Sequence, residues 1–268
     1  MFFILQKENK FDTDILILKN ILDKNKFIHN YNIVSLDFFN SDNIDDYDIS
    51  LKEAIPVGTI QFVSRWLEIF HGVSEAIPIE IPPCLRTEYF LKRKYSIRTK
   101  EDIPQQGYYF IKDASQLKVF SFNGELSLFI YPEIWTKSEN EFDNSLRLNP
   151  NHLYQVSEVV DILSEYRVYI INGNIENIVH YNGDPTIFPD VKLIEEANLL
   201  YSREKDYPKS YSMDVMVTPK GTALIEIHYF SSLGLYSTLF GDNLAYAYRD
   251  GIDYLINHNT KQTVFSNF

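Results

Sequence analysis

The chain has 268 residues, of which 45% are hydrophobic and 23% are charged, and its formal net charge is −12. The composition is that of a globular protein, and no apolar run approaches the roughly 20 residues that a bilayer crossing needs. The acidic balance argues against nucleic acid, or an anionic membrane surface, as the main partner.

Residues 1–80 are predicted to form a small α/β domain. Short apolar runs flank a segment in which Ile15, Leu18 and Leu22 keep helical spacing, so a strand–helix–strand start is expected. Three prolines within residues 76–83 mark the expected domain boundary. The elements expected before this boundary are strands over 1–5 and 31–38, a helix over 13–26, a turn at 55–59 and a helix over 60–71.

Residues 81–268 are predicted to form an α+β domain in which antiparallel strand pairs dominate. Many short runs rich in β-branched and aromatic residues are separated by turn residues, as in paired strands. The expected strands cover 107–112, 118–122, 125–131, 154–160, 165–171, 175–181, 213–218 and 222–229. The expected helices cover 86–95, about 189–204 and about 239–257.

A late hairpin holds the most informative residues. Residues 219–221 are Pro-Lys-Gly, a turn of the length that closes a hairpin. If Thr218 faces Thr222, Asp214 lies directly opposite Glu226, and two carboxylates meet across the strand pair.

Alternation sorts the side chains of this hairpin into two faces. Asp214, Glu226 and His228 share one face. The other face is expected to turn apolar side chains to a core, namely Val215, Val217, Ile225 and Ile227. Two close carboxylates repel each other unless a cation or a proton lies between them, so a divalent metal site is one interpretation. The other is a solvated strand face, because a one-residue slip in register breaks the pairing.

Three basic residues lie on or after other predicted strands. Arg167 belongs to a hairpin that turns at Asn172-Gly173, and its planar fork suits phosphate or carboxylate. Lys112 ends an aromatic strand and Lys118 follows a short polar loop, which suits anion binding. The alternatives are an exposed cross-strand ion pair for the arginine and solvated side chains for the lysines.

Several common catalytic motifs are missing from the sequence. It has no P-loop, no Gly-x-Gly-x-x-Gly, no Gly-x-Ser-x-Gly and no His-x-x-x-His. Cys84, the single cysteine, follows two prolines and is interpreted as a packing residue. One cysteine cannot form an intrachain disulfide, which suits a reducing cytoplasm.

The order of these segments resembles the ATP-grasp superfamily, and within it the phage- and bacteria-associated clade named for two arginines and a lysine. The resemblance covers about residues 105–240: a lysine that ends a strand, a Glu-Tyr-Arg strand, and an Asp and a Glu on a late hairpin before a Gly-containing loop. It implies two α+β subdomains that grip ATP between them. It also implies a cytoplasmic protein, in the host cytoplasm if the chain is phage-encoded.

The resemblance implies a nucleotide role for several residues. Lys112 would bind the phosphates, with Lys118 as a helper. The strand over 155–160 would meet the adenine edge as a hinge, with Glu158 and Val160 beside the base.

The resemblance also implies the residues of the reaction centre. Arg167 would hold the transferring phosphoryl group, and Asp214 and Glu226 would hold Mg²⁺, or Mn²⁺. His228 stands where the family commonly has Asn, so it is expected either to bond a phosphate or to select a softer metal. The second arginine of the clade is one of Arg65, Arg86 and Arg147.

The function implied is an ATP- and Mg²⁺-dependent ligase that joins a carboxylate to an amine through an acyl-phosphate. The substrates would be small molecules or peptides. Two alternatives stay open. One is a non-catalytic nucleotide-binding or protein-interaction module on the same fold. The other is a glycosidase pair, although residues directly opposite on a hairpin are close compared with the roughly 5–9.5 Å that glycosidases use.

Overall fold

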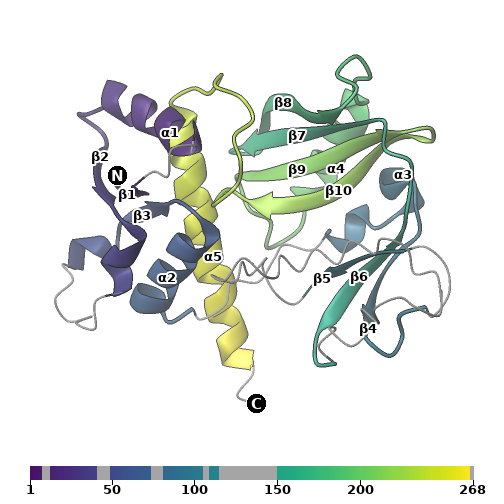
Figure 1. Ribbon diagram of the computed structural model, residues 1–268, viewed down its shortest axis with the longest axis horizontal. Helices are drawn as coiled ribbons and strands as arrows, with labels where there is room; N and C mark the ends of the chain where they lie inside the picture. The colour runs from purple at the N-terminus through teal and green to yellow at the C-terminus, as the bar shows by residue number, and fades with distance from the viewer. Residues whose placement is uncertain (8–12, 41–48, 74–80, 105–108, 115–149, 266–268) are drawn as a thin grey trace, which may run out of the picture.

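The computed structural model describes residues 1–7, 13–40, 49–73, 81–104, 109–114 and 150–265 (Figure 1). These residues form a parallel three-stranded sheet, an antiparallel four-stranded sheet and an antiparallel three-stranded sheet. The chain is thus of the α+β class. The strands predicted over 118–122 and 125–131 lie outside the described residues. No helix in the described ranges combines the length and apolar character that a bilayer-spanning segment requires.

The first sheet confirms the predicted strand–helix–strand start. Its strand order is β2-β1-β3, and the apolar side chains of α1 that were predicted to face the core are buried. Its elements are β1 (Phe2–Gln6), α1 (Thr13–Lys24), β2 (Asn30–Val34), β3 (Ile55–Val57) and α2 (Ile60–His71). The strand predicted over 31–38 is shorter than expected, because residues Leu36–Asn40 form a 3-10 helix.

The prediction of a turn over 55–59 is wrong for residues 55–57. Residues Ile55–Val57 form β3, which pairs with β1 and is buried throughout. Pro56 misled the prediction, because proline signals a turn but is tolerated in an edge strand, where its missing N–H is not needed. The turn is confined to Gly58 and Thr59, and the Thr59 hydroxyl caps α2 by accepting a hydrogen bond from the Phe62 amide.

Helix α5 (Asn243–Phe265) lies between the first sheet and the four-stranded sheet (Figure 1). Leu244 and Tyr248 of α5 belong to one apolar core with Phe3 of β1 and Phe230, which follows the four-stranded sheet. This core fixes the N-terminal elements against the sheet that carries most of the predicted site.

The four-stranded sheet has the order β10-β9-β7-β8. One face of this sheet is covered by α4 (Val191–Tyr201), whose Leu193, Ile194 and Ala197 pack in one core with Val168 and Met213 of the sheet. Its strands are β7 (Ser164–Ile171), β8 (Asn174–Gly183), β9 (Tyr211–Thr218) and β10 (Gly221–Tyr229). All four strands were predicted within a few residues.

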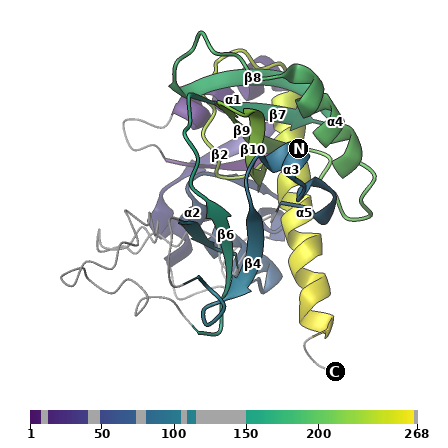
Figure 2. The same cartoon turned by 90° about the vertical axis from the view of Figure 1, so that its right-hand side faces the viewer.

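The second three-stranded sheet has the order β4-β6-β5 and lies below the four-stranded sheet in both views (Figures 1 and 2). Its strands are β4 (Tyr95–Thr99), β5 (Tyr109–Asp113) and β6 (Leu153–Glu158). The helix predicted over 86–95 is largely wrong. Only α3 (Glu88–Leu91) is helical, because Lys92 takes a left-handed conformation with φ 51° and stops it. The β-branched and aromatic residues that follow then form β4.

The β9–β10 hairpin contains a bulge that the sequence did not predict. At the turn Thr218 pairs with Gly221, so the predicted pairing with Thr222 is wrong. A bulge between Leu224 and Glu226 then shifts the register by one residue. Beyond it Asp214 pairs with Glu226, as predicted. The extra residue, Ile225, lines a cavity instead of the core in which it was expected.

Candidate active site

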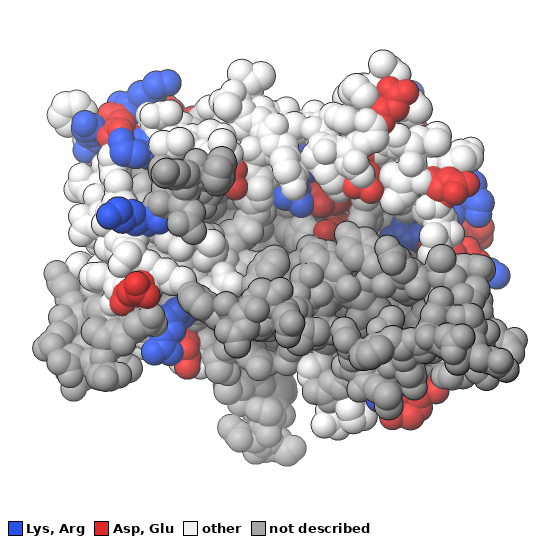
Figure 3. Space-filling view, in the orientation of Figure 1, with Lys and Arg blue, Asp and Glu red and all other residues white. Residues whose placement is uncertain are grey.

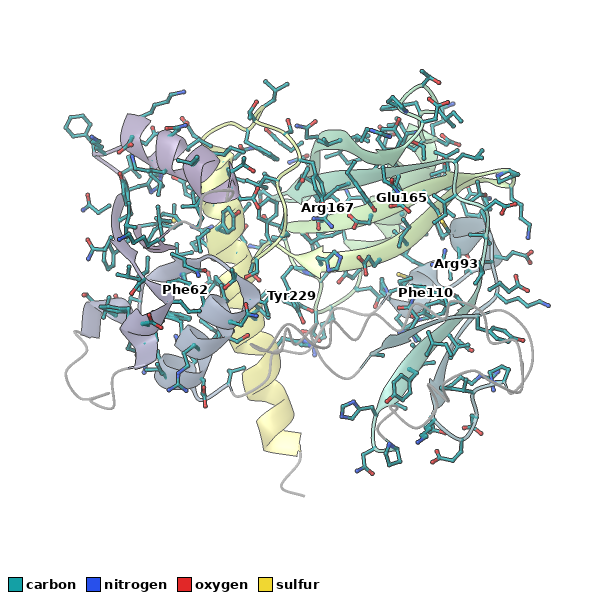
Figure 4. The ribbon with its side chains drawn as sticks, viewed as in Figure 1. Phe62, Arg93, Phe110, Glu165, Arg167 and Tyr229 are labelled. Atoms are coloured by element: carbon teal, nitrogen blue, oxygen red, sulfur yellow. The ribbon has the colours of Figure 1, made fainter. Side chains whose placement is uncertain are left out.

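A cavity of about 570 Å³ lies between the two antiparallel sheets. Phe110, Gln155 and Ser157 line it from the three-stranded sheet, and Arg167 and Asp214 line it from the four-stranded sheet. Figure 4 shows Arg93 and Phe110 on one side of this space and Arg167 on the other. On the molecular surface, basic and acidic side chains lie next to one another in a recess near the centre of the view (Figure 3).

Arg167 and Asp214 form a buried ion pair in the wall of the cavity. Their strands β7 and β9 are neighbours, and the two residues are direct partners in the pairing register. Nε donates to Oδ1 and Nη2 to Oδ2, both at 2.7 Å. Burial opposes the charge of Arg167, but the Asp214 carboxylate outweighs it and raises the pKa of the guanidinium. The guanidinium is therefore held in its charged form.

Asp214, Glu226 and His228 form a cluster beside this ion pair. One ligand atom from each of the three lies within 4.8 Å of the others. His228 Nε2 is 2.7 Å from Glu226 Oε1 and 3.9 Å from Asp214 Oδ2. Two carboxylates and an imidazole suit a divalent cation, and the carboxylates are the donors that Mg²⁺ prefers. The donor set therefore fits the expected metal.

The end of β6 and the segment that follows it form part of the cavity wall. Glu158 and Val160 line the cavity. The Glu158 carboxylate accepts a hydrogen bond from the Lys94 amide at 3.1 Å, and this bond lowers the pKa of Glu158. The carboxylate thereby ties the end of β6 to the start of β4.

An aromatic pair covers Arg167 on the cavity side. Tyr181 and Tyr236 stack with their ring centroids 5.0 Å apart. The Arg167 guanidinium lies 5.0 Å from the Tyr236 centroid and 5.9 Å from that of Tyr181. Neither tyrosine was among the predicted site residues. Tyr181 was inside a predicted strand, but its approach to Tyr236, which lies in a later loop, is a tertiary contact without a local signal.

Arg93 is the second buried arginine that lines the cavity, and it was not among the predicted site residues. It is 6% exposed, and burial lowers the pKa of its guanidinium to about 10. Nη1 donates to the Leu91 carbonyl at 3.1 Å and to the Leu224 carbonyl at 2.7 Å, and Nη2 donates to the Ile225 carbonyl at 3.4 Å.

The arginines that the sequence analysis did select lie elsewhere. Arg65 pairs with Glu68 on α2 at 2.5 Å. Arg86 Nε donates to the Ile81 carbonyl at 2.5 Å. Arg147 lies outside the described residues. Neither Arg65 nor Arg86 is among the residues that line the 570 Å³ cavity.

Of the two predicted lysines, the described residues include only Lys112. The backbone of Lys112 pairs in β5 with Gln155 of β6, a residue that lines the cavity. Lys118 lies outside the described residues. Phosphate binding by both lysines stays a prediction.

A smaller cavity of about 190 Å³ lies between the N-terminal elements and the loop after β10. Asp14 and Thr59 line it from the N-terminal elements, and Ser232 and Gly234 line it from the loop after β10. The Gly234 carbonyl accepts a hydrogen bond from Arg167 Nη1 at 3.2 Å. One loop thus contacts both the ion pair and the smaller cavity.

Comparisons with known proteins agree with this arrangement. A family model for an ATP-grasp domain, family 2 of the clade named for two arginines and a lysine, matches residues 90–245. Among curated proteins, none matches the sequence. One similar structure is D-alanine–D-alanine ligase from Bacillus anthracis complexed with ATP, with a TM-score of 0.50, 13% identity and coverage of 97% of each chain. Another is the macrocyclase MdnC from Microcystis aeruginosa bound with the precursor peptide MdnA, with a TM-score of 0.50, 13% identity and coverage of 96% of this chain and 100% of that one.

Proposed function

Because the chain belongs to the ATP-grasp superfamily, and within it to family 2 of the clade named for two arginines and a lysine, we propose that it is an ATP- and Mg²⁺-dependent ligase that joins a carboxylate to an amine. The observation that carries this proposal is the buried Arg167–Asp214 pair beside Glu226 and His228, in the wall of a cavity between two sheets. Such a site combines a phosphate-binding cation with a set of metal-binding oxygens.

The nucleotide would occupy the cavity between the sheets. Its volume of about 570 Å³ lies within the range of about 300–1,000 Å³ typical of ligand sites. Phe110 and Ile225 supply apolar walls for the base, and the segment at Glu158 and Val160 supplies backbone groups at its edge. Lys112 and Lys118 would bind the phosphates.

The acidic pair would hold the metal. Asp214 and Glu226 offer carboxylate oxygens on one face of the hairpin. Bound there, Mg²⁺ would neutralise negative charge on the transferring phosphate. His228 would bond a phosphate oxygen, because imidazole is a poor ligand for Mg²⁺. Arg167 would hold the transferring phosphoryl group with its guanidinium.

The reaction would run in two steps. A substrate carboxylate attacks the γ-phosphorus of ATP, so that an acyl-phosphate forms and ADP leaves. An amine then attacks the acyl carbon, so that an amide forms and inorganic phosphate and a proton leave. Water must stay out while the acyl-phosphate exists.

We assign the smaller cavity to part of a substrate other than ATP. Asp14 and Thr59 give it polar walls, and its loop contacts Arg167 through Gly234. The two similar structures are a D-alanine–D-alanine ligase and a macrocyclase bound with a precursor peptide, which favours an amino acid or a peptide as substrate. We place the reaction in the cytoplasm, where ATP and Mg²⁺ are abundant, and in the host cytoplasm for a phage-encoded chain.

A second candidate is a non-catalytic module that binds a nucleotide or a protein on the same fold. Two observations favour it: His228 stands at a place where an oxygen ligand is expected, and both carboxylate oxygens of Asp214 already accept hydrogen bonds from Arg167.

Thermal unfolding with and without ligand, followed by an ADP-release assay, tests the proposal. Mg-ATP at a hundredfold excess over its Kd should raise the free energy of unfolding by about 2.7 kcal/mol. ADP release that depends on both an amino acid or peptide carboxylate and an amine would identify a ligase. Binding of Mg-ATP without any such turnover would favour the module, and no shift with ATP or ADP would reject nucleotide binding.

A further inference from the structure

We infer that Arg93 is a positioning residue, which holds Glu226 opposite Asp214 by binding the peptide carbonyls of the β10 bulge. The inference rests on the proposed function in one respect, namely that the acidic pair is the metal site. Arg93 lies just before β4 of the three-stranded sheet, whereas the site whose geometry it would fix lies on the four-stranded sheet.

The bulge decides which residue faces Asp214. From the turn to Leu224 the hairpin follows one register, and from Glu226 onward the pairing is displaced by one residue. If the first register continued, Asp214 would pair with Ile225, and Glu226 would pair with Met213. Met213 is fully buried in the apolar core under the sheet. A slip of one residue would therefore turn the Glu226 carboxylate away from Asp214 and into this core.

A bulge needs polar partners of its own, because its extra residue interrupts the hydrogen bonds of the ladder. The extra residue is Ile225, which lines the cavity, and the residue before it, Leu224, is 1% exposed. The hydrogen bond that the Leu224 carbonyl accepts is buried, and an unpaired buried carbonyl is destabilising. Arg93 donates to both carbonyls, at 2.7 Å and 3.4 Å. A guanidinium is suited to this task because its donors are arranged in a rigid fork.

The local chain explains how Arg93 reaches the bulge. The left-handed Lys92 ends α3 and redirects the chain just before Arg93. Arg93 also donates to the Leu91 carbonyl of α3 itself, which anchors the side chain at its origin. Within the described ranges its recorded hydrogen bonds go to carbonyls and none to a carboxylate. A buried cation bound to neutral carbonyls on two elements serves to join those elements.

Binding of Mn²⁺ alone, measured by the EPR signal of the free ion, tests the inference without relying on turnover. Arg93→Met keeps the apolar stem of the side chain and removes all the donors. We expect it to weaken Mn²⁺ binding by about 10–100-fold, the usual effect of removing a partner that orients metal ligands. The matched control is Arg86→Met, from the same segment, because Arg86 bonds the Ile81 carbonyl instead. It should bind Mn²⁺ as the wild type does.

Deletion of Ile225 separates positioning from a general effect on folding. Without this residue Leu224 and Glu226 are adjacent, and the hairpin pairs Asp214 with Glu226 in one regular register that needs no bulge. Adding the deletion to Arg93→Met should therefore recover most of the lost Mn²⁺ affinity. If Arg93→Met does not fold, Arg93→Lys replaces it in the comparison, and its single donor group should still bind Mn²⁺ more weakly than the wild type.

Wild-type affinity in the folded arginine variant, or no recovery on deletion of Ile225, would overturn the inference and leave the proposed function standing. Absence of Mn²⁺ binding in the wild type would instead reject the acidic pair as the metal site, and the inference with it.

Discussion

Arg167 and Asp214 are joined by two parallel hydrogen bonds of 2.7 Å, and the residues are only 8% and 2% exposed. A bidentate pair of this kind is among the stronger polar contacts in proteins, but its two charges have both lost their hydration. Each residue therefore depends on the other, and a metal or phosphate that enters the site competes with an existing partner. A substitution of Arg167 should therefore affect Asp214, and a substitution of Asp214 should affect Arg167.

Arg167→Met should lower the free energy of unfolding by about 3–5 kcal/mol, because it leaves the buried Asp214 charge without a partner. Urea denaturation at pH 7 measures the loss. The matched control is Arg249→Met, which breaks a pair with Asp250 at the same 2.7 Å but with 42% of the arginine side chain exposed. It should lose only about 0–1 kcal/mol. Equal losses in the two variants would contradict the buried pairing.

The two acidic residues should respond differently to neutralisation. Glu226→Gln should weaken Mn²⁺ binding with little change in stability, because its carboxylate contacts His228 and its side chain is 19% exposed. Asp214→Asn should weaken Mn²⁺ binding and also destabilise the fold, because it removes the charge that Arg167 binds. Mn²⁺ EPR and urea denaturation on both variants make the comparison. Undiminished Mn²⁺ binding in both variants would reject the metal pair.

The hairpin shows how far the sequence alone predicts this site. Alternation places Asp214 and Glu226 on one face, but the predicted pairing of Thr218 with Thr222 is wrong by one residue, and Asp214 lies opposite Glu226 because the bulge offsets that error. The same signals miss the bulge. Its polar partner, Arg93, lies 131 residues earlier than Leu224 in the sequence, and no local pattern reports a contact of that range.

The segment that contains Arg93 was also misinterpreted. Its basic and apolar residues suit a helix, but the left-handed Lys92 and the β-forming residues from Tyr95 onward end that helix early. Pairing with β6 then outweighs helix propensity. The four strands of the larger sheet were predicted well because their alternation is regular and their turns contain glycine.

His29 should make the stability depend on pH near neutrality. It is 3% exposed and packs between Phe3 of β1 and Tyr246 of α5. Burial, and then the nearby N-terminal amine, lower its pKa below the ordinary value of about 6.5. The unfolded chain therefore binds a proton more readily, so this contribution is complete above about pH 6.5 and is lost as the pH falls below it.

Urea denaturation at pH 7.5 and 5.5 measures this dependence. His29→Phe keeps an aromatic ring between Phe3 and Tyr246 and should lose less stability than the wild type over this interval. His71 has a lowered pKa as well, so part of the dependence should remain in the variant. An identical pH dependence in the two proteins would contradict the assignment to His29.

His228 distinguishes a phosphate-binding role from a metal-binding role. Its Nε2 lies 2.7 Å from Glu226 Oε1 and 3.9 Å from Asp214 Oδ2, so it is close enough to contact either a metal or a phosphate in this site. An imidazole ligand would favour Mn²⁺ over Mg²⁺, and its replacement by Asn would move the preference toward Mg²⁺. A phosphate contact would instead leave the metal preference unchanged. We expect His228→Asn to weaken ADP binding and to leave the ratio of Mn²⁺ to Mg²⁺ affinity as in the wild type. Calorimetry with ADP and each metal measures both quantities, and a shift of the ratio toward Mg²⁺ with unchanged ADP affinity would assign His228 to the metal.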